Sequence, residues 1–333
     1  MKIKIKKVAI LCSGGNAPGM SSCINTFIKK CLSLHITPIT FSNGFVGLYE
    51  NRYRILKPKY TQLFISDGSA LIGTSRAPKF IDDLAYRQQC VNNLKALNVD
   101  ALFVVGGEGS YKGAYELTKL GIKVITIPAT IDNDVSSTDY TIGYDTCLNN
   151  ICKVIDNIND VFISHHGVAI IEIMGRSCPD LTIRSGIANG ATYIVTKDSL
   201  LTKDQFLDIV KKTFAKGKIN ATFIVTEKIY GTDGLPSLSD VAKYIEKKTK
   251  LMTRYIEVGY IQRGGEPSAR DRLLANYMIN IGMISLLAGR YNRAICVKNH
   301  KTYDIDLAKA IKTKKRKDLN RTLVSQFNKI NQE

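Results

Sequence analysis

Several patterns that would point to particular protein classes are missing from the sequence. The 333 residues include eight cysteines but no Cys-x-x-Cys pair. This spacing argues against a disulfide framework or a zinc site and favours reduced thiols, so we expect a cytoplasmic protein. The longest apolar stretch, around Tyr277–Ala288, is too short to span a bilayer and predicts a buried helix. The basic start, Met1–Lys7, lacks the apolar segment of a signal peptide, and we expect no membrane partner.

Acidic residues are scarce, with 29 Asp and Glu against 47 Lys and Arg, which gives a formal charge of +18. Such an excess favours anionic partners, and nucleic acid is the first to consider. The lysines are spread along the chain, however, and the one dense run, Lys312–Lys317, comes with no zinc finger, RNP-like aromatic motif or helix-turn-helix spacing. We interpret that run as a solvated, lysine-rich tail helix and expect no nucleic-acid partner.

The sequence does contain repeated units of buried strand, loop and helix. Such repetition predicts a doubly wound α/β fold, and the length suffices for two domains. Strands are predicted at Val8–Ser13, Ile36–Phe41, Ala101–Val105, Val124–Ile127, Val168–Ile173, Tyr193–Thr196, Ala221–Thr226 and Tyr255–Val258. Helices are predicted at Asp83–Leu97, Thr141–Asn159, Lys203–Lys216 and Leu238–Lys248, and loops at Asn43–Tyr49 and Gly73–Pro78.

The segment Pro128–Asp134 places two carboxylates directly after a predicted strand. Loops at the carboxyl ends of strands are where open α/β sheets bind their ligands. Asp132 and Asp134 are separated only by Asn133, which suits a carboxylate that accepts a proton beside one that holds a metal or orients its neighbour. The alternative is an Asx-rich turn in which both aspartates cap backbone amides.

Two glycine-rich turns lie between a predicted strand and a helix, at Gly14–Ser21 and Gly106–Ser110. Backbone N–H groups at a helix N-terminus favour phosphate. The first turn is not a Walker motif, because Met20 stands where that motif needs lysine. In the second, Gly107, Gly109 and Gly113 resemble a variant dinucleotide fingerprint, which leaves a nicotinamide-dependent dehydrogenase as an alternative. The acidic residue expected to bind the ribose about 20 residues later is absent.

Taken together, five motifs resemble those of the ATP-dependent 6-phosphofructokinase family of the bacterial type. They are Ser13–Met20, Gly106–Ser110, Thr130–Asp134, Met174–Arg176 and Gly259–Gly265, and the similarity runs from about Val8 to Asn299. The resemblance implies two similar doubly wound, three-layer α/β domains with the active site in the cleft. Residues 1–143 with 262–300 would form the nucleotide-binding domain, and 144–261 with 301–333 the sugar-phosphate-binding domain.

The resemblance also implies a role for each matching residue. Asp132 would accept the proton of the C1 hydroxyl of fructose 6-phosphate, supported by Asp134. The migrating phosphoryl group would contact Thr130, Arg76 and Arg176. ATP would be lined by Gly15, Phe45, Arg76, Gly107, Gly109, Ser110 and Gly113, and Glu108 would hold Mg²⁺. The sugar phosphate would be bound by Thr130, Asp132, Met174, Gly175, Arg176, Glu227, Tyr260 and Arg263, with Arg254 reaching it from a neighbouring subunit of a homo-oligomer, a tetramer in bacterial relatives.

Other positions refine the expected chemistry. Gly109 and Ala129 are small where pyrophosphate-using relatives carry a bulky acid and a lysine, so ATP should fit. Glu108 and Asn16 replace aspartates, while Gly167 and Tyr260 replace an arginine and a histidine that bind the sugar phosphate. Losing two charge-assisted hydrogen bonds, at roughly 1.5–3 kcal/mol each, predicts weaker binding of fructose 6-phosphate. The same replacements leave open a weakly active homologue that serves as a regulatory subunit beside a paralogous one.

Overall fold

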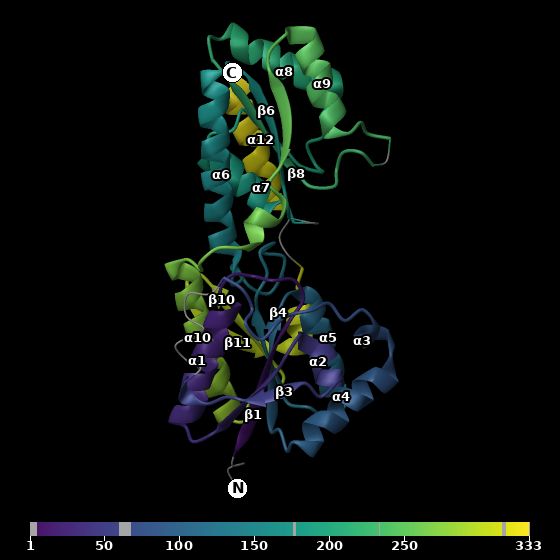
Figure 1. The fold of residues 1–333 in the computed structure, drawn as a ribbon, viewed down its shortest axis with the longest axis vertical. Coiled ribbons are helices and arrows are strands. Elements are labelled where there is room, and N and C mark those ends of the chain that lie inside the picture. The colour runs from purple at the N-terminus through teal and green to yellow at the C-terminus, as the bar shows by residue number, and fades with distance from the viewer. Residues whose placement is uncertain (1–4, 60–67, 176–177, 233, 315–317, 333) are drawn as a thin grey trace. The chain divides into compact units, whose positions relative to one another are not determined.

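A computed structural model of the chain describes residues 5–59, 68–175, 178–232, 234–314 and 318–332. The chain forms two compact units, one from residues 1–146 and 263–315 and the other from 147–262 and 316–333. Each unit is built on one sheet (Figure 1). No helix within the described residues is both long and apolar enough to cross a membrane.

The first unit contains a seven-stranded sheet in the order β11-β10-β5-β4-β1-β2-β3. The five inner strands run parallel, whereas the edge strands β3 and β11 are antiparallel to their neighbours. Its elements are β1 (Lys7–Ser13), α1 (Met20–Ser33), β2 (Thr37–Phe41), α2 (Gly44–Tyr49), β3 (Tyr53–Ile55), α3 (Lys79–Asp82), α4 (Leu84–Ala96), β4 (Ala101–Gly106), α5 (Glu108–Lys119), β5 (Val124–Pro128), α10 (Ala269–Leu287), β10 (Arg293–Lys298), β11 (Lys301–Asp306) and α11 (Leu307–Lys312).

Helices cover both faces of this sheet. On one face, α2, α4, α5 and α11 share a core with the strands that includes Phe41 and Tyr111. On the other face lie α1 and α10, where the rings of Phe27 and Phe103 are 5.3 Å apart and Gly282 has no room for a side chain against Phe103. Strands buried on both faces are continuously apolar, which is why the sequence located the inner strands closely.

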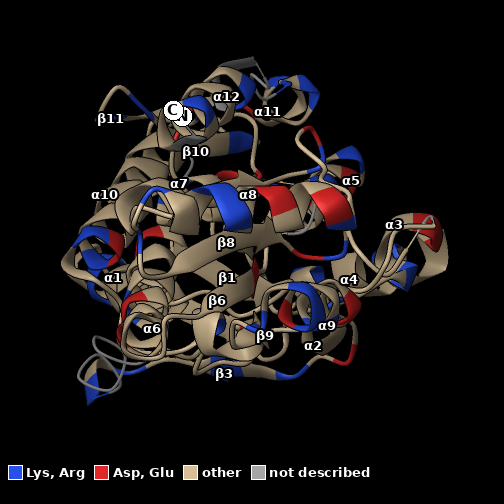
Figure 2. Ribbon diagram, turned by 90° about the horizontal axis from the view of Figure 1, so that it is seen from above, with Lys and Arg blue, Asp and Glu red and all other residues tan. Residues whose placement is uncertain are grey.

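The second unit contains a four-stranded parallel sheet in the order β7-β8-β6-β9. Its elements are α6 (Tyr144–Ser164, which begins in the first unit), β6 (Val168–Ile173), α7 (Asp180–Ala188), β7 (Tyr193–Val195), α8 (Lys203–Ala215), β8 (Ala221–Thr226), α9 (Leu238–Thr249), β9 (Thr253–Glu257), the short 3-10 helix η2 (Gly259–Arg263, whose last residue belongs to the first unit) and α12 (Asp318–Gln332). Both basic and acidic residues lie on α8 and on α9 (Figure 2).

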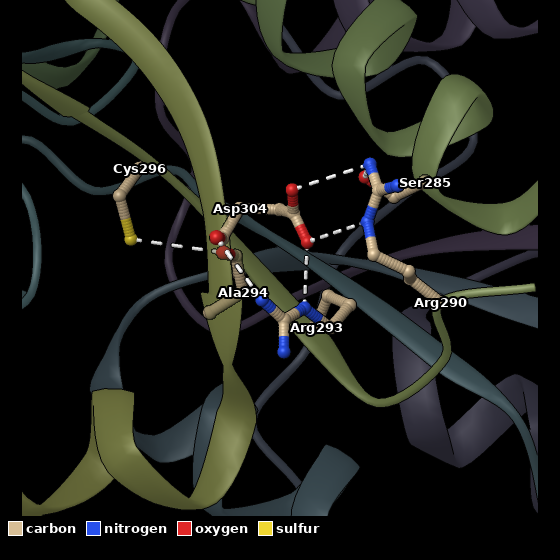
Figure 3. Close-up of polar contacts among 6 residues, drawn as sticks. All are labelled: Ser285, Arg290, Arg293, Ala294, Cys296 and Asp304. Atoms are coloured by element: carbon tan, nitrogen blue, oxygen red, sulfur yellow. Dashed lines mark hydrogen bonds and ion pairs between the residues drawn. The ribbon is translucent and has the colours of Figure 1, made fainter. Parts of the chain in front are cut away.

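The expected domain boundary near residue 300 is wrong for the segment that follows it. β11, which was expected in the second domain, pairs with β10 across a turn in which Asn299 and His300 both have positive φ. Asp304 of β11 accepts hydrogen bonds from Nε of Arg293 at 2.6 Å and of Arg290 at 3.3 Å (Figure 3). Burial alone would raise the pKa of Asp304, but these two guanidinium groups lower it. The hairpin therefore belongs to the first sheet.

Two local predictions are also wrong. The predicted loop Asn43–Tyr49 contains helix α2. Its two glycines, which suggested a loop, are present because neighbouring residues leave no room for a side chain: a Cβ on Gly47 would overlap the carbonyl oxygen of Ser42. The predicted tail helix over Lys312–Lys317 does not form at its start, since α11 ends at Lys312 and Thr313 is extended. Residues 315–317 lie outside the described residues.

Candidate active site

The first glycine turn leads from β1 into α1. Gly14 and Gly19 have φ of 101° and 102°, a left-handed conformation that suits glycine. Helix α1 begins at Met20 with no side-chain cap and no acidic residue in its first turn. The positive end of the helix dipole is therefore not neutralised by the helix itself, as a phosphate-binding turn requires.

The second glycine turn is tied to the first by Ser110. Its buried hydroxyl donates to the carbonyl oxygen of Ser13 at 3.0 Å, and Gly106 has no room for a side chain between the same two residues. Gly109, by contrast, faces open space: a Cβ there would meet no atom within 4 Å. The structure thus brings Gly15, Gly107, Gly109 and Ser110 into two connected turns, with Ser110 serving as the link.

Two other residues expected near the nucleotide lie in the core behind the second turn. Phe45 of α2 is buried and stacks on Phe80, with the ring centroids 4.1 Å apart. Gly113 of α5 packs against both rings, where an added Cβ would lie 3.0 Å from Phe45. Phe45 and Gly113 therefore belong to the apolar core that packs behind the second glycine turn.

Arg76 lies in a loop that is fastened to the first glycine turn. The N–H of Gly14 donates to the carbonyl oxygen of Ser75 at 3.0 Å, and the hydroxyl of Thr74 donates to the carbonyl oxygen of Gly14 at 3.1 Å. Arg76 itself is exposed and has no hydrogen-bond or ion-pair partner among the described residues. The loop therefore fixes the backbone of an arginine whose guanidinium group is available to an anion.

Arg263 also lies at the first glycine turn, within the same unit. Its Nη1 would be only 3.0 Å from a Cβ on Gly15 and is 3.5 Å from the carbonyl oxygen of Asn16. The sequence assigned Arg263 to the sugar phosphate, and the structure places its guanidinium group beside a predicted ATP-binding residue. This neighbour could not be foreseen, because the two segments are 247 residues apart.

Asn16 holds three segments of the first unit together. Its Nδ2 donates to the carbonyl oxygens of Gly68 at 3.0 Å and Arg263 at 3.1 Å, and its Oδ1 accepts from the N–H of Ala70 at 2.9 Å. An aspartate, which the resemblance to other sequences implies at this position, could not donate the first two bonds. Asn16 therefore stabilises the site through these three bonds. The sequence comparison had identified it only as a residue that differs from the expected motif.

Replacing Asn16 with alanine should lower the free energy of unfolding by about 1–3 kcal/mol, because three backbone groups lose their partners. Chemical denaturation measures the change. Asn92→Ala is the matched control: Asn92 is exposed, and within the described part of the chain its side chain only accepts a bond from Gln88, so its loss should cost no more than about 0.5 kcal/mol. Equal effects of the two substitutions would contradict the role assigned to Asn16.

The loop after β5 buries Asp132 and is held by its neighbour. Asn133 has a φ of 49°; its Oδ1 accepts from the N–H of Thr141 at 3.1 Å, and its Nδ2 donates to the carbonyl oxygen of Asp139 at 3.2 Å. Asp132 is 8% exposed, and its backbone N–H donates to Oγ1 of Thr130 at 3.2 Å. Asn133 therefore stabilises the loop through hydrogen bonds of the kind made in Asx turns. Thr130 accepts the bond from Asp132, so its hydroxyl proton can be donated to another acceptor.

Glu108, the expected metal ligand, opens α5. Its Oε1 lies 2.6 Å from Nζ of Lys112, one turn further along the helix, and both side chains are about half exposed. Within the described residues, no group of three or more His, Cys, Asp or Glu side chains is placed to hold a metal ion. Mg²⁺ that also binds substrate phosphates needs only one or two carboxylates, and Glu108 meets that lower requirement.

A buried carboxylate beside the first turn was not selected from the sequence. Oδ2 of Asp271 accepts bonds from the N–H and the hydroxyl of Thr146, at 2.8 and 2.5 Å. Burial raises the pKa of Asp271 to about 6, against the opposing effect of these bonds. The pair joins the start of α10 to the start of α6.

Within the second unit, several residues predicted for the site lie at the ends of β6 and β8. The N–H of Gly175 donates to Oε1 of Glu227 at 3.2 Å, and the N–H of Met174 donates to Oε1 of the buried Gln262 at 2.9 Å. Arg176 lies outside the described residues. The structure thus brings together Met174, Gly175 and Glu227, with Gln262 as a support that the sequence did not single out.

Three further positions concern the expected sugar-phosphate contacts. Nη1 of Arg254 lies 2.9 Å from both carboxylate oxygens of Glu246 on α9. Tyr260 is 83% exposed. Gly167 is closely packed, since an added Cβ would lie 2.8 Å from the carbonyl oxygen of Met252, so this backbone does not accommodate the arginine that the resemblance implied here.

Comparison with known proteins gives one consistent family. Residues 7–284 match the Phosphofructokinase family. The chain is 41% identical over 312 residues to an ATP-dependent 6-phosphofructokinase of Photobacterium profundum, which covers 94% of this chain and 95% of that protein. An ATP-dependent 6-phosphofructokinase of Buchnera aphidicola is also 41% identical over the same shares.

Solved structures show the same fold. Phosphofructokinase from Saccharomyces cerevisiae superposes with a TM-score of 0.82 and 27% identity over 98% of this chain and 48% of that chain. A pyrophosphate-dependent phosphofructokinase from Nitrosospira multiformis superposes with a TM-score of 0.82 over 97% of this chain and 91% of that chain, but at 18% identity it informs the fold alone.

Proposed function

Because the chain belongs to the phosphofructokinase family, we propose that it transfers the γ-phosphoryl group of ATP to the C1 hydroxyl of fructose 6-phosphate, giving fructose 1,6-bisphosphate and ADP. The observation that carries the proposal is the buried Asp132 in a loop held by Asn133, in a chain about 40% identical to ATP-dependent 6-phosphofructokinases over nearly its whole length. The dehydrogenase alternative loses its basis, since the three glycines it relied on lie at the start and in the middle of α5 in a chain of the phosphofructokinase family.

The described side chains suit the demands of phosphoryl transfer, which are positioning and positive charge near the transferred group. Asp132 accepts the proton of the attacking hydroxyl. Arg76, fixed through Ser75 to the first turn, neutralises charge on the phosphoryl oxygens, and the Thr130 hydroxyl donates to one of them. Arg176, Asp134, Glu227 and Arg263 complete the proposed set.

ATP rather than pyrophosphate is the proposed donor. Gly109 faces open space, and Ala129 is buried at the end of β5, so neither position carries the bulky side chain that would narrow the nucleotide site. A coupled assay for fructose 1,6-bisphosphate with ATP or pyrophosphate as donor tests the choice. Turnover with ATP at least tenfold above that with pyrophosphate is expected, and the reverse order would refute the proposal.

Mg²⁺ is the proposed cofactor, supplying positive charge to the ATP phosphates, with Glu108 as its protein ligand. Replacing Glu108 with glutamine should raise the Mg²⁺ concentration for half-maximal activity about tenfold or more, because a neutral amide is a weaker ligand for a hard cation. Lys112→Met is the control. An exposed pair four residues apart is worth about 0.3–0.5 kcal/mol, so its loss should shift the Mg²⁺ requirement by about twofold at most. Similar Mg²⁺ curves for Glu108→Gln and the native chain would remove Glu108 from the site.

The protein is proposed to act in the cytoplasm as a homotetramer. All eight cysteines are free, seven are buried, and burial raises the pKa of Cys12 to about 12, which suits unreactive reduced thiols. In a tetramer, Arg254 would exchange Glu246 for the sugar phosphate of a neighbouring subunit.

A weakly active, regulatory homologue is the second candidate, and the packing at Gly167 favours it. Because no side chain fits there, one cation that the family directs at the sugar phosphate is absent, and the exposed Tyr260 supplies no charge. A turnover number comparable to that of an active bacterial relative assayed in parallel, at saturating fructose 6-phosphate, would exclude this candidate.

A further inference from the structure

Helix α10 is apolar on two sides. One side packs into the first unit through residues that include Met278, Gly282 and Met283. The opposite side exposes four large apolar side chains, Leu273 at 53%, Tyr277 at 54%, Ile284 at 50% and Leu287 at 48%. A helix on the surface of a globular unit ordinarily has a single apolar stripe, so the second one indicates another contact. The sequence predicted a buried helix here, whereas the described residues of the single chain leave this side exposed.

The exposed side chains follow the spacing of a coiled-coil seam. Leu273, Tyr277, Asn280, Ile284 and Leu287, which we call the α10 seam, are separated by four, three, four and three residues. That is the a/d pattern of the heptad repeat, over a length of about 21 Å at 1.5 Å per residue. The one polar member, Asn280, stands in the middle, and a single asparagine in such a seam is a known means of fixing register.

To within one residue, the seam is also symmetric about Asn280. When a second α10 is laid antiparallel with the two Asn280 residues opposite each other, Leu273 lies opposite Leu287 of the other copy, and Tyr277 lies opposite Met283, one residue or about 1.5 Å from Ile284. A surface that is its own complement under a two-fold axis is what an isologous contact between identical chains requires. Antiparallel helices also bring opposite dipole ends together. The occupant that matches this symmetry is a second copy of the chain.

Both ends of α10 are held in place, so the seam is presented on a fixed helix. Asp271 in the first turn accepts two bonds from Thr146. Past the last turn, Arg290 donates to Ser285 at 3.2 Å and to Asp304 (Figure 3). A preordered surface loses less entropy on association. Four half-exposed side chains from each copy bury less than the roughly 1,200 Å² of a stable interface. The α10 contact is therefore either weak by itself or one part of a larger interface between the two copies.

We infer that α10 pairs antiparallel with α10 of a second copy across a two-fold axis. The inference does not depend on the proposed catalytic function, because its test measures mass and cross-linking rather than turnover.

Introducing opposite charges across the seam tests the pairing and its direction. Sedimentation of the full chain should show concentration-dependent self-association that Tyr277→Lys or Ile284→Glu alone weakens at least tenfold. The double variant should return to within about threefold of the native chain, since the introduced lysine of each copy would then face the introduced glutamate of the other. Circular dichroism confirms that each variant is folded. Self-association that is absent, unchanged in both single variants or not restored in the double variant would overturn the inference.

Cysteine cross-linking gives an independent test of register. Asn280→Cys places two thiols at the two-fold axis, and mild oxidation should yield a covalent dimer. Asn276→Cys is the matched control, also exposed on α10, but the two copies of residue 276 would be separated by about 12 Å along the seam. Equal cross-linking of the two variants, or none for Asn280→Cys, would contradict antiparallel pairing.

Discussion

Replacing Asp132 with asparagine should lower kcat about 10²–10⁴-fold, the usual contribution of a general base. The substitution keeps the shape of the side chain and the bond from its N–H to Thr130, but it removes the acceptor for the proton of the C1 hydroxyl. KM for ATP should change little, because Asp132 is proposed to contact the sugar. Steady-state kinetics with both substrates varied measures the effect.

Asp208→Asn is the matched control for this experiment. Asp208 is exposed on α8, so the same chemical change there should leave kcat within about twofold and the melting temperature unaltered. Because Asp132 is buried, the melting temperature of its variant must also be measured. A folded Asp132→Asn protein with a kcat within threefold of the native value would remove Asp132 from the role of base.

Replacing Arg76 with alanine should lower kcat about 10²–10³-fold with little loss of stability. Arginines that neutralise the charge of the transferred phosphoryl group make some of the largest contributions to kcat in phosphoryl transfer. Arg76 is exposed and bonds to none of the described residues, so its removal should leave the packing of the protein unchanged. A change in kcat can therefore be separated from a change in stability. Arg76→Lys should recover only part of the activity, since lysine lacks the planar fork of donors.

Arg54→Ala serves as the control for lost positive charge. Arg54 is exposed on the edge strand β3 of the same unit, and its removal should change kcat by less than about twofold. If Arg54→Ala and Arg76→Ala slowed the reaction equally, the effect would be one of net charge. Unchanged activity in Arg76→Ala would exclude contact with the phosphoryl group.

The inner strands were predictable because parallel strands buried on both faces read as continuous apolar runs. Val168–Ile173 and Ala221–Thr226 match β6 and β8 residue for residue. The edges were not predictable in this way. β11 is only half-buried, and the segment of the first domain was expected to end at residue 300, where the structure has the turn at Asn299 and His300. Helix α2 was missed because two of its six residues are glycine, which tertiary packing selects against local propensity.

The candidate site was predictable where function lies in a contiguous motif. The two glycine turns and the Asp132 loop follow strands, and the sheet brings them together. Contacts between distant segments were not predictable: Asn16 bonds to Arg263, and Arg254 is paired with Glu246. The pair between Glu108 and Lys112 could have been found, because oppositely charged residues four apart on a helix lie side by side.

The most direct test of the account is ³¹P NMR of the reaction of the full chain with ATP, Mg²⁺ and fructose 6-phosphate. The account predicts a new sugar-phosphate resonance at C1, formed in equal amount to ADP, and lost in the Asp132→Asn protein. Formation of ADP and inorganic phosphate without a phosphorylated sugar, or phosphorylation at another hydroxyl, would contradict it.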